Sequence, residues 1–208
     1  MNSDPAYEAV KKAKRQVEGG NPRGAAQTLE DYLATDPHNI RPRMELARIA
    51  VYDLKDLEYG AMQLEAILDL DPDNADALKA AVTAMSKDKK YNKKTDEYFG
   101  RLLEKEQSAE VFNLYAKYLR RQKGDFAGAG EYYRKALALS PGDPDIHRNY
   151  AVLLLNDLKD YEKAREELEY LMAVSPGDAN LRKNYDRLMK QKFDKNGNLK
   201  KSRFGMFR

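Results

Sequence analysis

The sequence predicts an all-α solenoid of stacked helix hairpins, and three observations support this fold class. Pro37, Pro72, Pro141 and Pro176 each lie in one of four similar phrases, TDPHN, LDPDN, LSPGD and VSPGD. The first two prolines are 35 residues apart, as are the last two, and the central gap of 69 residues fits two units, one of which lacks its proline near Gln107. Apolar residues between the phrases recur three and four positions apart, as in amphipathic helices. Units of this length bury their hydrophobic faces only by stacking.

Two helices are expected in each unit. The expected first helices cover about residues 6–18, 40–53, 74–87, 109–122, 144–156 and 179–192. The expected second helices cover about residues 22–35, 57–69, 92–105, 126–139 and 161–174. The turns YDLKD, QKGDF and NDLKDY separate first from second helices and place Asp56, Asp125 and Asp160 as N-caps. Loops this short make neighbouring helices antiparallel and leave no room for a sheet.

Small residues recur where the two helices of a unit should cross. They are Ala13, Ala47, Ala116 and Ala151 in first helices, and Ala25, Gly60, Ala129 and Ala164 in second helices. With the closing prolines, these columns resemble the tetratricopeptide repeat family. The resemblance implies a right-handed α-α superhelical solenoid of about five hairpins plus a C-terminal capping helix. It also implies a non-catalytic scaffold or adaptor for protein–protein interaction.

The resemblance divides the chain into a repeat domain, residues 1–192, and a basic aromatic tail, residues 193–208. The five repeats and the capping helix are placed at about residues 6–39, 40–74, 75–108, 109–143, 144–178 and 179–192. The third repeat has Val82 and Thr95 at the small positions and no closing proline. We therefore expect its interfaces with its neighbours to be the weakest of the stack.

Composition excludes several function classes. The absence of cysteine excludes disulfides and thiolate metal sites, and His38 and His147 are too isolated to indicate a metal centre. There is no Gly-rich phosphate loop and no nucleophile beside a histidine, so we predict neither an enzyme nor a cofactor. No run of about eighteen apolar residues and no secretion signal is present, and we expect a cytoplasmic protein.

The family binds its ligands in the groove lined by first helices. Positions three before, one after and five after each small residue lie on one stripe of those helices. From the second repeat onward they are Met44, Arg48, Tyr52, Lys79, Thr83, Lys87, Asn113, Lys117, Arg121, Arg148, Val152, Asn156, Lys183, Arg187 and Gln191. Eight of these fifteen are basic and none is acidic. A basic groove favours an acidic peptide, a C-terminal carboxylate or a phosphate backbone, whereas a simply solvated face is the alternative interpretation.

Asn149 and Asn184 follow basic residues of the stripe, and these pairs could hold a carboxylate. The predicted partner-binding residues are Arg48, Tyr52, Lys79, Lys87, Asn113, Lys117, Arg121, Arg148, Asn149, Lys183, Asn184 and Arg187. Some members of the family grip the acidic C-terminus of heat-shock chaperones with a lysine and asparagine clamp in their first two repeats. This chain lacks that pairing, because its first helices offer Val10, Lys14, Met44 and Arg48 there.

The sequence offers two alternative functions. Helical repeats of the pentatricopeptide family read RNA, but residues 1–189 hold 30 basic and 33 acidic residues, without the broad basic surface that phosphate binding needs. Residues 190–208 hold seven basic residues and one acidic residue, among Phe193, Leu199, Phe204, Met206 and Phe207. This tail could associate weakly with an anionic membrane or dock on an acidic partner. The sequence leaves the oligomeric state open.

Overall fold

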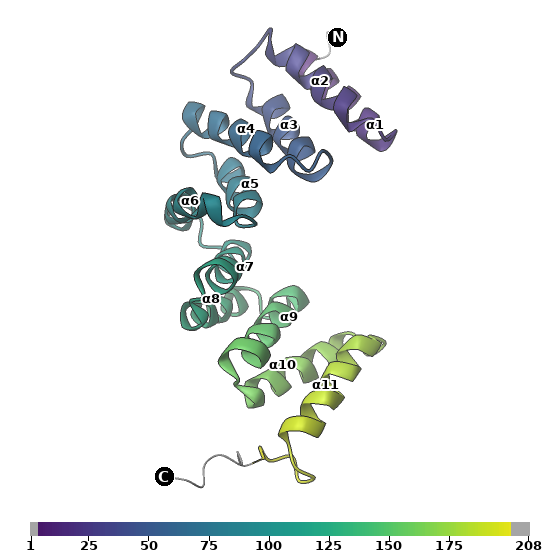
Figure 1. The fold of residues 1–208 in the computed structure, drawn as a ribbon, viewed down its shortest axis with the longest axis vertical. Coiled ribbons are helices and arrows are strands. Elements are labelled where there is room, and N and C mark those ends of the chain that lie inside the picture. Colours follow the sequence, from purple (N-terminus) through teal and green to yellow (C-terminus); the bar gives the residue numbers. More distant parts are fainter. Residues whose placement is uncertain (1–3, 201–208) are drawn as a thin grey trace. The chain divides into compact units, whose positions relative to one another are not determined.

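A computed structural model describes residues 4–200 of the chain (Figure 1). Over this range the fold contains eleven α-helices and no β-strand, which confirms the all-α prediction. The chain forms two compact units, Met1–Gln107 and Ser108–Arg208, and each is described by itself.

Unit 1 consists of three helix hairpins. Its helices are α1 (Pro5–Glu18), α2 (Pro22–Leu33), α3 (Ile40–Tyr52), α4 (Leu57–Leu70), α5 (Ala75–Met85) and α6 (Asn92–Lys105), with the 3-10 turn η1 (Lys89–Tyr91) before α6. Each helix packs on the next along the chain, and α1 also packs on α3. Figure 1 shows the resulting succession of antiparallel hairpins. The predicted bounds of these helices are confirmed to within two residues. One of the largest deviations is at α5, which ends at Met85 where the prediction ended at residue 87.

Unit 2 consists of two hairpins and a final single helix. Its helices are α7 (Ala109–Tyr118), α8 (Phe126–Leu139), α9 (Pro144–Leu153), α10 (Tyr161–Val174) and α11 (Ala179–Lys192). The helices α7 and α9 continue into π-helical turns, η2 (Leu119–Lys123) and η3 (Leu154–Leu158), where the sequence predicted unbroken α-helix. Leu181 and Leu188 of α11 are buried, as expected for a helix that packs on α10 and covers the last hairpin.

In three of the hairpins, one aspartate in the turn makes hydrogen bonds both to the end of the first helix and to the start of the second. The carboxylates of Asp56, Asp125 and Asp160 accept hydrogen bonds from N–H groups three residues later, at 2.9, 2.9 and 3.2 Å. These contacts confirm the predicted N-caps. Their own N–H groups bond back to carbonyls six residues earlier, and the residue before each aspartate has a positive φ. A Schellman ending has the same left-handed residue, but its returning bond spans five residues, so these endings are one residue wider, in keeping with the π-helical turns that end α7 and α9.

All eight small residues at the predicted crossings are buried. Gly60 in α4 shows why size matters, because an added Cβ would lie 2.3 Å from Cγ2 of Val51 and 3.2 Å from the carbonyl oxygen of Ala47. The third repeat keeps its crossing despite larger side chains: Val82 and Thr95 are fully buried, and the Thr95 hydroxyl donates to the carbonyl of Tyr91. That this repeat opens most readily stays a prediction.

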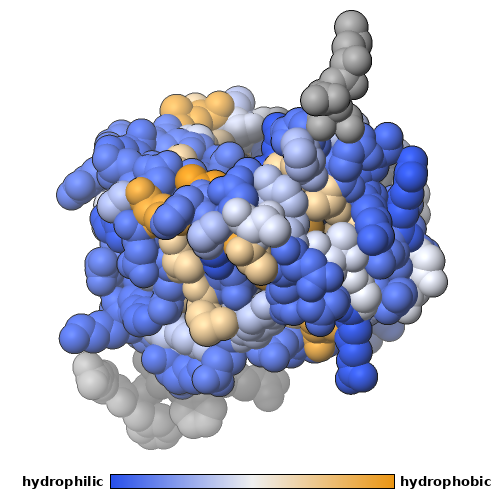
Figure 2. Space-filling model, turned by 90° about the horizontal axis from the view of Figure 1, so that it is seen from above, coloured by the Kyte–Doolittle hydropathy of each residue, from blue (hydrophilic) through white to orange (hydrophobic). Residues whose placement is uncertain are grey.

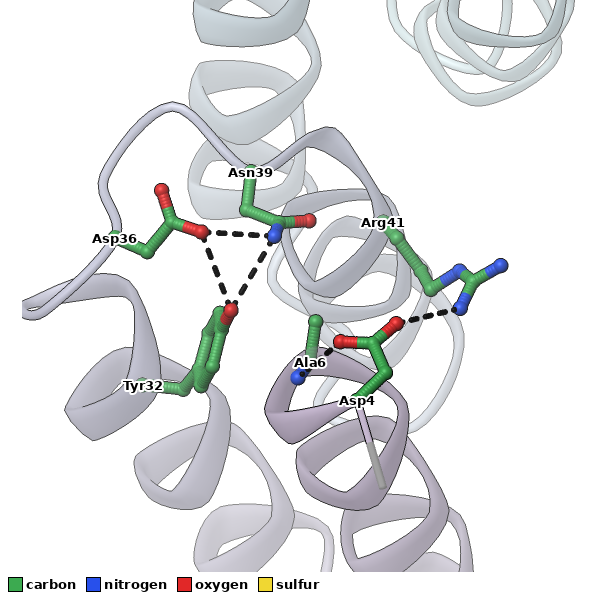
Figure 3. Close-up of polar contacts among 6 residues, drawn as sticks. All are labelled: Asp4, Ala6, Tyr32, Asp36, Asn39 and Arg41. Atoms are coloured by element: carbon green, nitrogen blue, oxygen red, sulfur yellow. Dashed lines mark hydrogen bonds and ion pairs between the residues drawn. The ribbon is translucent and has the colours of Figure 1, made fainter. Parts of the chain in front are cut away.

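The first closing phrase, TDPHN, is held by a small polar network (Figure 3). The amide of Asn39 donates to Asp36 at 2.9 Å and to the Tyr32 hydroxyl at 3.3 Å, and that hydroxyl donates to Asp36 at 3.2 Å. Burial, and then the hydrogen bond to Asp36, raise the pKa of Tyr32. The network joins the end of α2 to the start of α3.

Part of the predicted tail is folded against α10. Phe193 is buried, forms an isolated bridge with Leu199, and lies under the guanidinium of Arg165 at 4.9 Å. Arg165 also donates to the carbonyl of Gly197, and Asp194 accepts from backbone N–H groups in the turn between them. Phe204, Met206 and Phe207 lie outside the described residues.

Candidate functional site

The predicted partner-binding residues lie on or just after first helices in both units. Unit 1 carries Arg48, Tyr52, Lys79 and Lys87 on α3 and α5, Lys87 two residues beyond the end of α5. Unit 2 carries Asn113, Lys117, Arg121, Arg148, Asn149, Lys183, Asn184 and Arg187 on α7 with η2, α9 and α11. The register predicted from the repeats therefore places each group on the equivalent helices of its unit.

In unit 1 two of the predicted cations are paired with acids. Arg48 donates to Glu45 at 2.8 Å and to Asp53 at 3.1 Å, and the hydrogen bond to Glu45 is the main reason that the pKa of Arg48 is raised. Lys79 lies 3.2 Å from Glu106 and 3.9 Å from Asp76. The sequence stripe omitted these acids because they lie off it, yet their side chains reach it. Unit 1 is therefore far less positive on this face than its stripe suggested.

Tyr52 and Lys87 are brought together in unit 1. The Lys87 ammonium lies 4.5 Å from the centroid of the Tyr52 ring, within the range of a cation–π interaction. Tyr52 as a residue remains 42% exposed, so this pair is accessible on the surface.

A small apolar pocket opens beside this pair. Its volume is about 180 Å³, and α3, α4 and α5 supply its walls. The lining residues are Met44, Glu45, Ala47, Arg48, Val51, Tyr52, Leu64, Ala80 and Ala84. A wider, more polar hollow between α1, α3 and α5 shares Met44 and Glu45 with it. The face of the molecule in Figure 2 is mostly hydrophilic, with apolar residues in separate spots.

In unit 2 the first helices are joined by asparagine. The Asn149 amide on α9 donates to the Asn113 side-chain oxygen on α7 at 3.2 Å. The bond leaves the Asn113 amide nitrogen and the Asn149 oxygen for solvent or a ligand. The side chain of Asn149 therefore bonds to its counterpart on α7, whereas its sequence neighbour Arg148 pairs with Asp145 at 2.7 Å.

Lys117 and Arg121 form the basic part of the unit 2 face. Burial, and then repulsion from Arg121, lower the pKa of Lys117, whereas Asp145 opposes the shift. Neither cation has an ion pair of 4.0 Å or less with another residue of the described range. The nearby carboxylate of Asp145 accepts a hydrogen bond from Arg148.

The third part of the unit 2 face lies on α11. Lys183 and Arg187 are exposed there, and Arg187 donates to the side-chain oxygen of Asn184 at 3.0 Å. The two predicted basic-asparagine pairs therefore each have an asparagine that is bonded elsewhere. A ligand that used them would have to exchange these hydrogen bonds for its own.

Other site classes find no support in the described range. Residues 4–200 contain no group of three or more His, Asp or Glu that could hold a metal ion. Within the same residues, every helix is too short or too polar to cross a membrane. Sequence reasoning missed the pocket beside Ala80 and Ala84, although small residues at those two positions were its available signal.

Comparison with known proteins identifies the same kind of repeat as the geometry. Residues 120–191 match the tetratricopeptide repeat family model. No curated protein matches the sequence. A tetratricopeptide repeat protein from Parabacteroides merdae ATCC 43184 has a similar structure, with a TM-score of 0.74 and 17% identity over 89% of this chain and 72% of that one.

Two further structures share the fold. Residues 41 to the end of MamA from Desulfovibrio magneticus RS-1 give a TM-score of 0.72 at 17% identity, over 86% of this chain and 99% of that one. PilF from Pseudomonas aeruginosa gives 0.70 at 22% identity, over 89% of this chain and 83% of that one. Repeats with this fold generally serve as scaffolds for protein–protein interaction. The family match over residues 120–191 and the shared fold confirm the predicted resemblance to tetratricopeptide repeat proteins.

Proposed function

We propose that the chain is a non-catalytic scaffold that binds an acidic segment of a partner protein on the first helices of unit 2. The observation that carries this proposal is the environment of Lys117. Its ammonium is partly buried beside Arg121, and the nearby Asp145 is already bonded to Arg148. Such surroundings disfavour the charged form of a lysine. A carboxylate from a partner would stabilise the charged form of Lys117. This stabilisation would add to the free energy of binding, because the free protein lacks it.

The neighbouring side chains suit a peptide. Arg121 follows Lys117 by one helical turn, and its planar guanidinium can hold a carboxylate with two parallel hydrogen bonds. The joined side chains of Asn113 and Asn149 keep N–H donors and carbonyl acceptor capacity, which match the C=O and N–H groups of an extended backbone. An acidic residue over Lys117 with its backbone near the asparagines would use both sets of groups.

Charge reversal tests the proposal. We expect a fluorescein-labelled peptide of alternating Glu and Ser to bind the full chain and to lose at least about tenfold in affinity when Lys117→Glu and Arg121→Glu are combined. The control combines Arg134→Glu and Lys135→Glu on α8, which changes the net charge equally away from the first helices. Anisotropy measures binding, and circular dichroism confirms folding. Equal loss in both variants would show only a general charge effect and contradict the site.

The same cations could attract a phosphate backbone, so a labelled single-stranded RNA is the second probe. The proposal predicts that the peptide binds more tightly than the RNA at the same salt concentration. Tighter binding of RNA, lost in the Lys117 and Arg121 variant, would replace the proposal with nucleic-acid recognition. Affinity for the peptide should fall as salt increases, because exposed charges are screened.

A further inference from the structure

The apolar pocket of unit 1 is lined by two small residues at positions where unit 2 has larger ones. Ala80 and Ala84 on α5 occupy the repeat positions that Asn149 and Leu153 occupy on α9. In unit 2 the Asn149 side chain bonds to α7 and Leu153 is fully buried, so larger side chains stand at the same two positions. In unit 1 two methyl groups leave space open between α3 and α5.

We propose that this pocket binds one bulky apolar side chain of a partner protein, next to an acidic residue of the same partner. The inference goes beyond the proposed function, because it concerns different residues in a different unit. A volume of about 180 Å³ is below the roughly 300–1,000 Å³ of typical small-molecule sites, so it suits a single side chain. The walls of Met44, Val51 and Leu64 offer that side chain an apolar surface.

The rim of the pocket indicates the charge beside that side chain. Arg48 lines the pocket, but its charge is compensated by Glu45 and Asp53. Lys87 lies over the Tyr52 ring at the same rim, and its ammonium makes no ion pair of 4.0 Å or less within residues 4–200. The cation left for a ligand is therefore Lys87. A carboxylate one or two residues from the buried apolar side chain would complement it.

Selection from a displayed library of random dodecapeptides tests the proposal without a known partner. Peptides enriched on the full-length chain should share a Leu, Ile, Met or Phe with an Asp or Glu within two residues. The affinity of a selected peptide is then measured by fluorescence anisotropy for variants of the pocket. Failure to enrich any peptide, or a consensus that lacks the apolar residue, overturns the proposal.

Two pairs of variants locate the binding. Ala80 is partly exposed, so the larger side chain of Ala80→Leu should fill the pocket. Binding should weaken about tenfold or more, as expected when the apolar side chain of the peptide can no longer be buried. Ala75→Leu on the same helix, outside the pocket, should leave the affinity unchanged. Lys87→Glu should weaken binding about fivefold, whereas Lys89→Glu nearby should not. Equal affinity for the wild type and Ala80→Leu overturns the proposal.

A last variant separates this inference from the proposed function. The combined Lys117→Glu and Arg121→Glu variant alters only unit 2, and it should retain the selected peptides at wild-type affinity. If the selected peptides instead require Lys117 and Arg121 and ignore Ala80→Leu, the pocket inference fails while the unit 2 site stands. Thermal unfolding of each variant confirms that the fold is intact.

Discussion

The imidazole of His147 on α9 lies between two oxygen acceptors: its Nδ1 is 2.5 Å from the Glu167 carboxylate on α10, and its Nε2 is 2.9 Å from the carbonyl oxygen of Pro141. Its ring also stacks on Tyr170 with a centroid distance of 3.9 Å. The histidine that looked isolated in the sequence therefore ties a closing proline phrase to the second helix that follows.

Unit 1 contains the same bridge with different residues. Arg43, at the equivalent position of α3, donates to the carbonyl of Pro37 at 2.6 Å and to the side chain of Gln63 on α4 at 2.8 Å. The repeats thus conserve a geometric role while the chemistry changes from arginine and glutamine to histidine and glutamate.

Removal of the bridge should destabilise unit 2. His147→Ala loses the polar contacts of the ring nitrogens and the ring stack, so we expect the free energy of unfolding to fall by about 1–3 kcal/mol. Urea unfolding followed by circular dichroism measures this change. The matched control is His38→Ala, because His38 is exposed. Indistinguishable unfolding of the two variants would mean that the bridge contributes nothing.

Two glycines on second helices should respond to alanine with opposite signs. Gly60→Ala forces a Cβ against Val51 and the Ala47 carbonyl and should cost about 1–3 kcal/mol. Gly100→Ala on α6 meets nothing within 4 Å and should stabilise by about 0.5–1 kcal/mol, because alanine restricts the unfolded chain. Thermal unfolding compares the two, and a stable Gly60→Ala protein would refute the close crossing of α3 and α4.

The residue before each N-cap aspartate has a left-handed backbone conformation, and substitutions at two such residues give a further comparison. Gly124 has φ 67° and nothing within 4 Å of an added Cβ, so Gly124→Ala should cost about 1–2 kcal/mol through backbone strain alone. Lys159 holds φ 58° at the equivalent position, and Lys159→Gly should stabilise slightly, because relief of strain exceeds the added chain entropy. The same sign for both changes would argue against a strained turn.

Helices, caps and crossings could be predicted because each follows from residues close in sequence. Proline phrases end helices, an aspartate such as Asp125 accepts from N–H groups of the next turn, and small residues such as Ala151 recur at a fixed register. These rules act within one hairpin. Because the repeats have a constant length, the same rules apply to each of them, and no tertiary contact has to be known.

Charge pairing and the pocket depend on side chains that meet across helices. Glu106 reaches Lys79 from the end of α6, so a stripe drawn on α5 alone overstated the positive charge of unit 1. The pocket depends jointly on Met44 and Ala80, which lie on separate helices. The fold of the early tail was missed for the same reason, because Phe193 is buried at a place where Arg165 of α10 lies over its ring.

Binding at unit 2 should depend on pH in a characteristic way. The pKa of Lys117 is lowered, so as pH rises this lysine loses its proton, and hence its attraction for a carboxylate, before ordinary exposed lysines do. Affinity for the acidic peptide should therefore decline at a lower pH than the deprotonation of ordinary exposed lysines would produce. An arginine stays charged across this whole titration, so Lys117→Arg should remove most of the decline. An identical pH profile for both proteins would count against a role for Lys117.

The most direct test of the central claim follows the Lys117 side chain itself by NMR while the peptide of alternating Glu and Ser is added. With lysine selectively labelled, the Lys117 signals are assigned by comparison with Lys117→Arg and titrated with pH in both states. The account predicts that peptide binding moves these signals and raises the pKa of Lys117, because a ligand carboxylate forms the ion pair that Lys117 lacks within residues 4–200. A bound peptide that leaves the Lys117 signals and pKa unchanged would contradict the account.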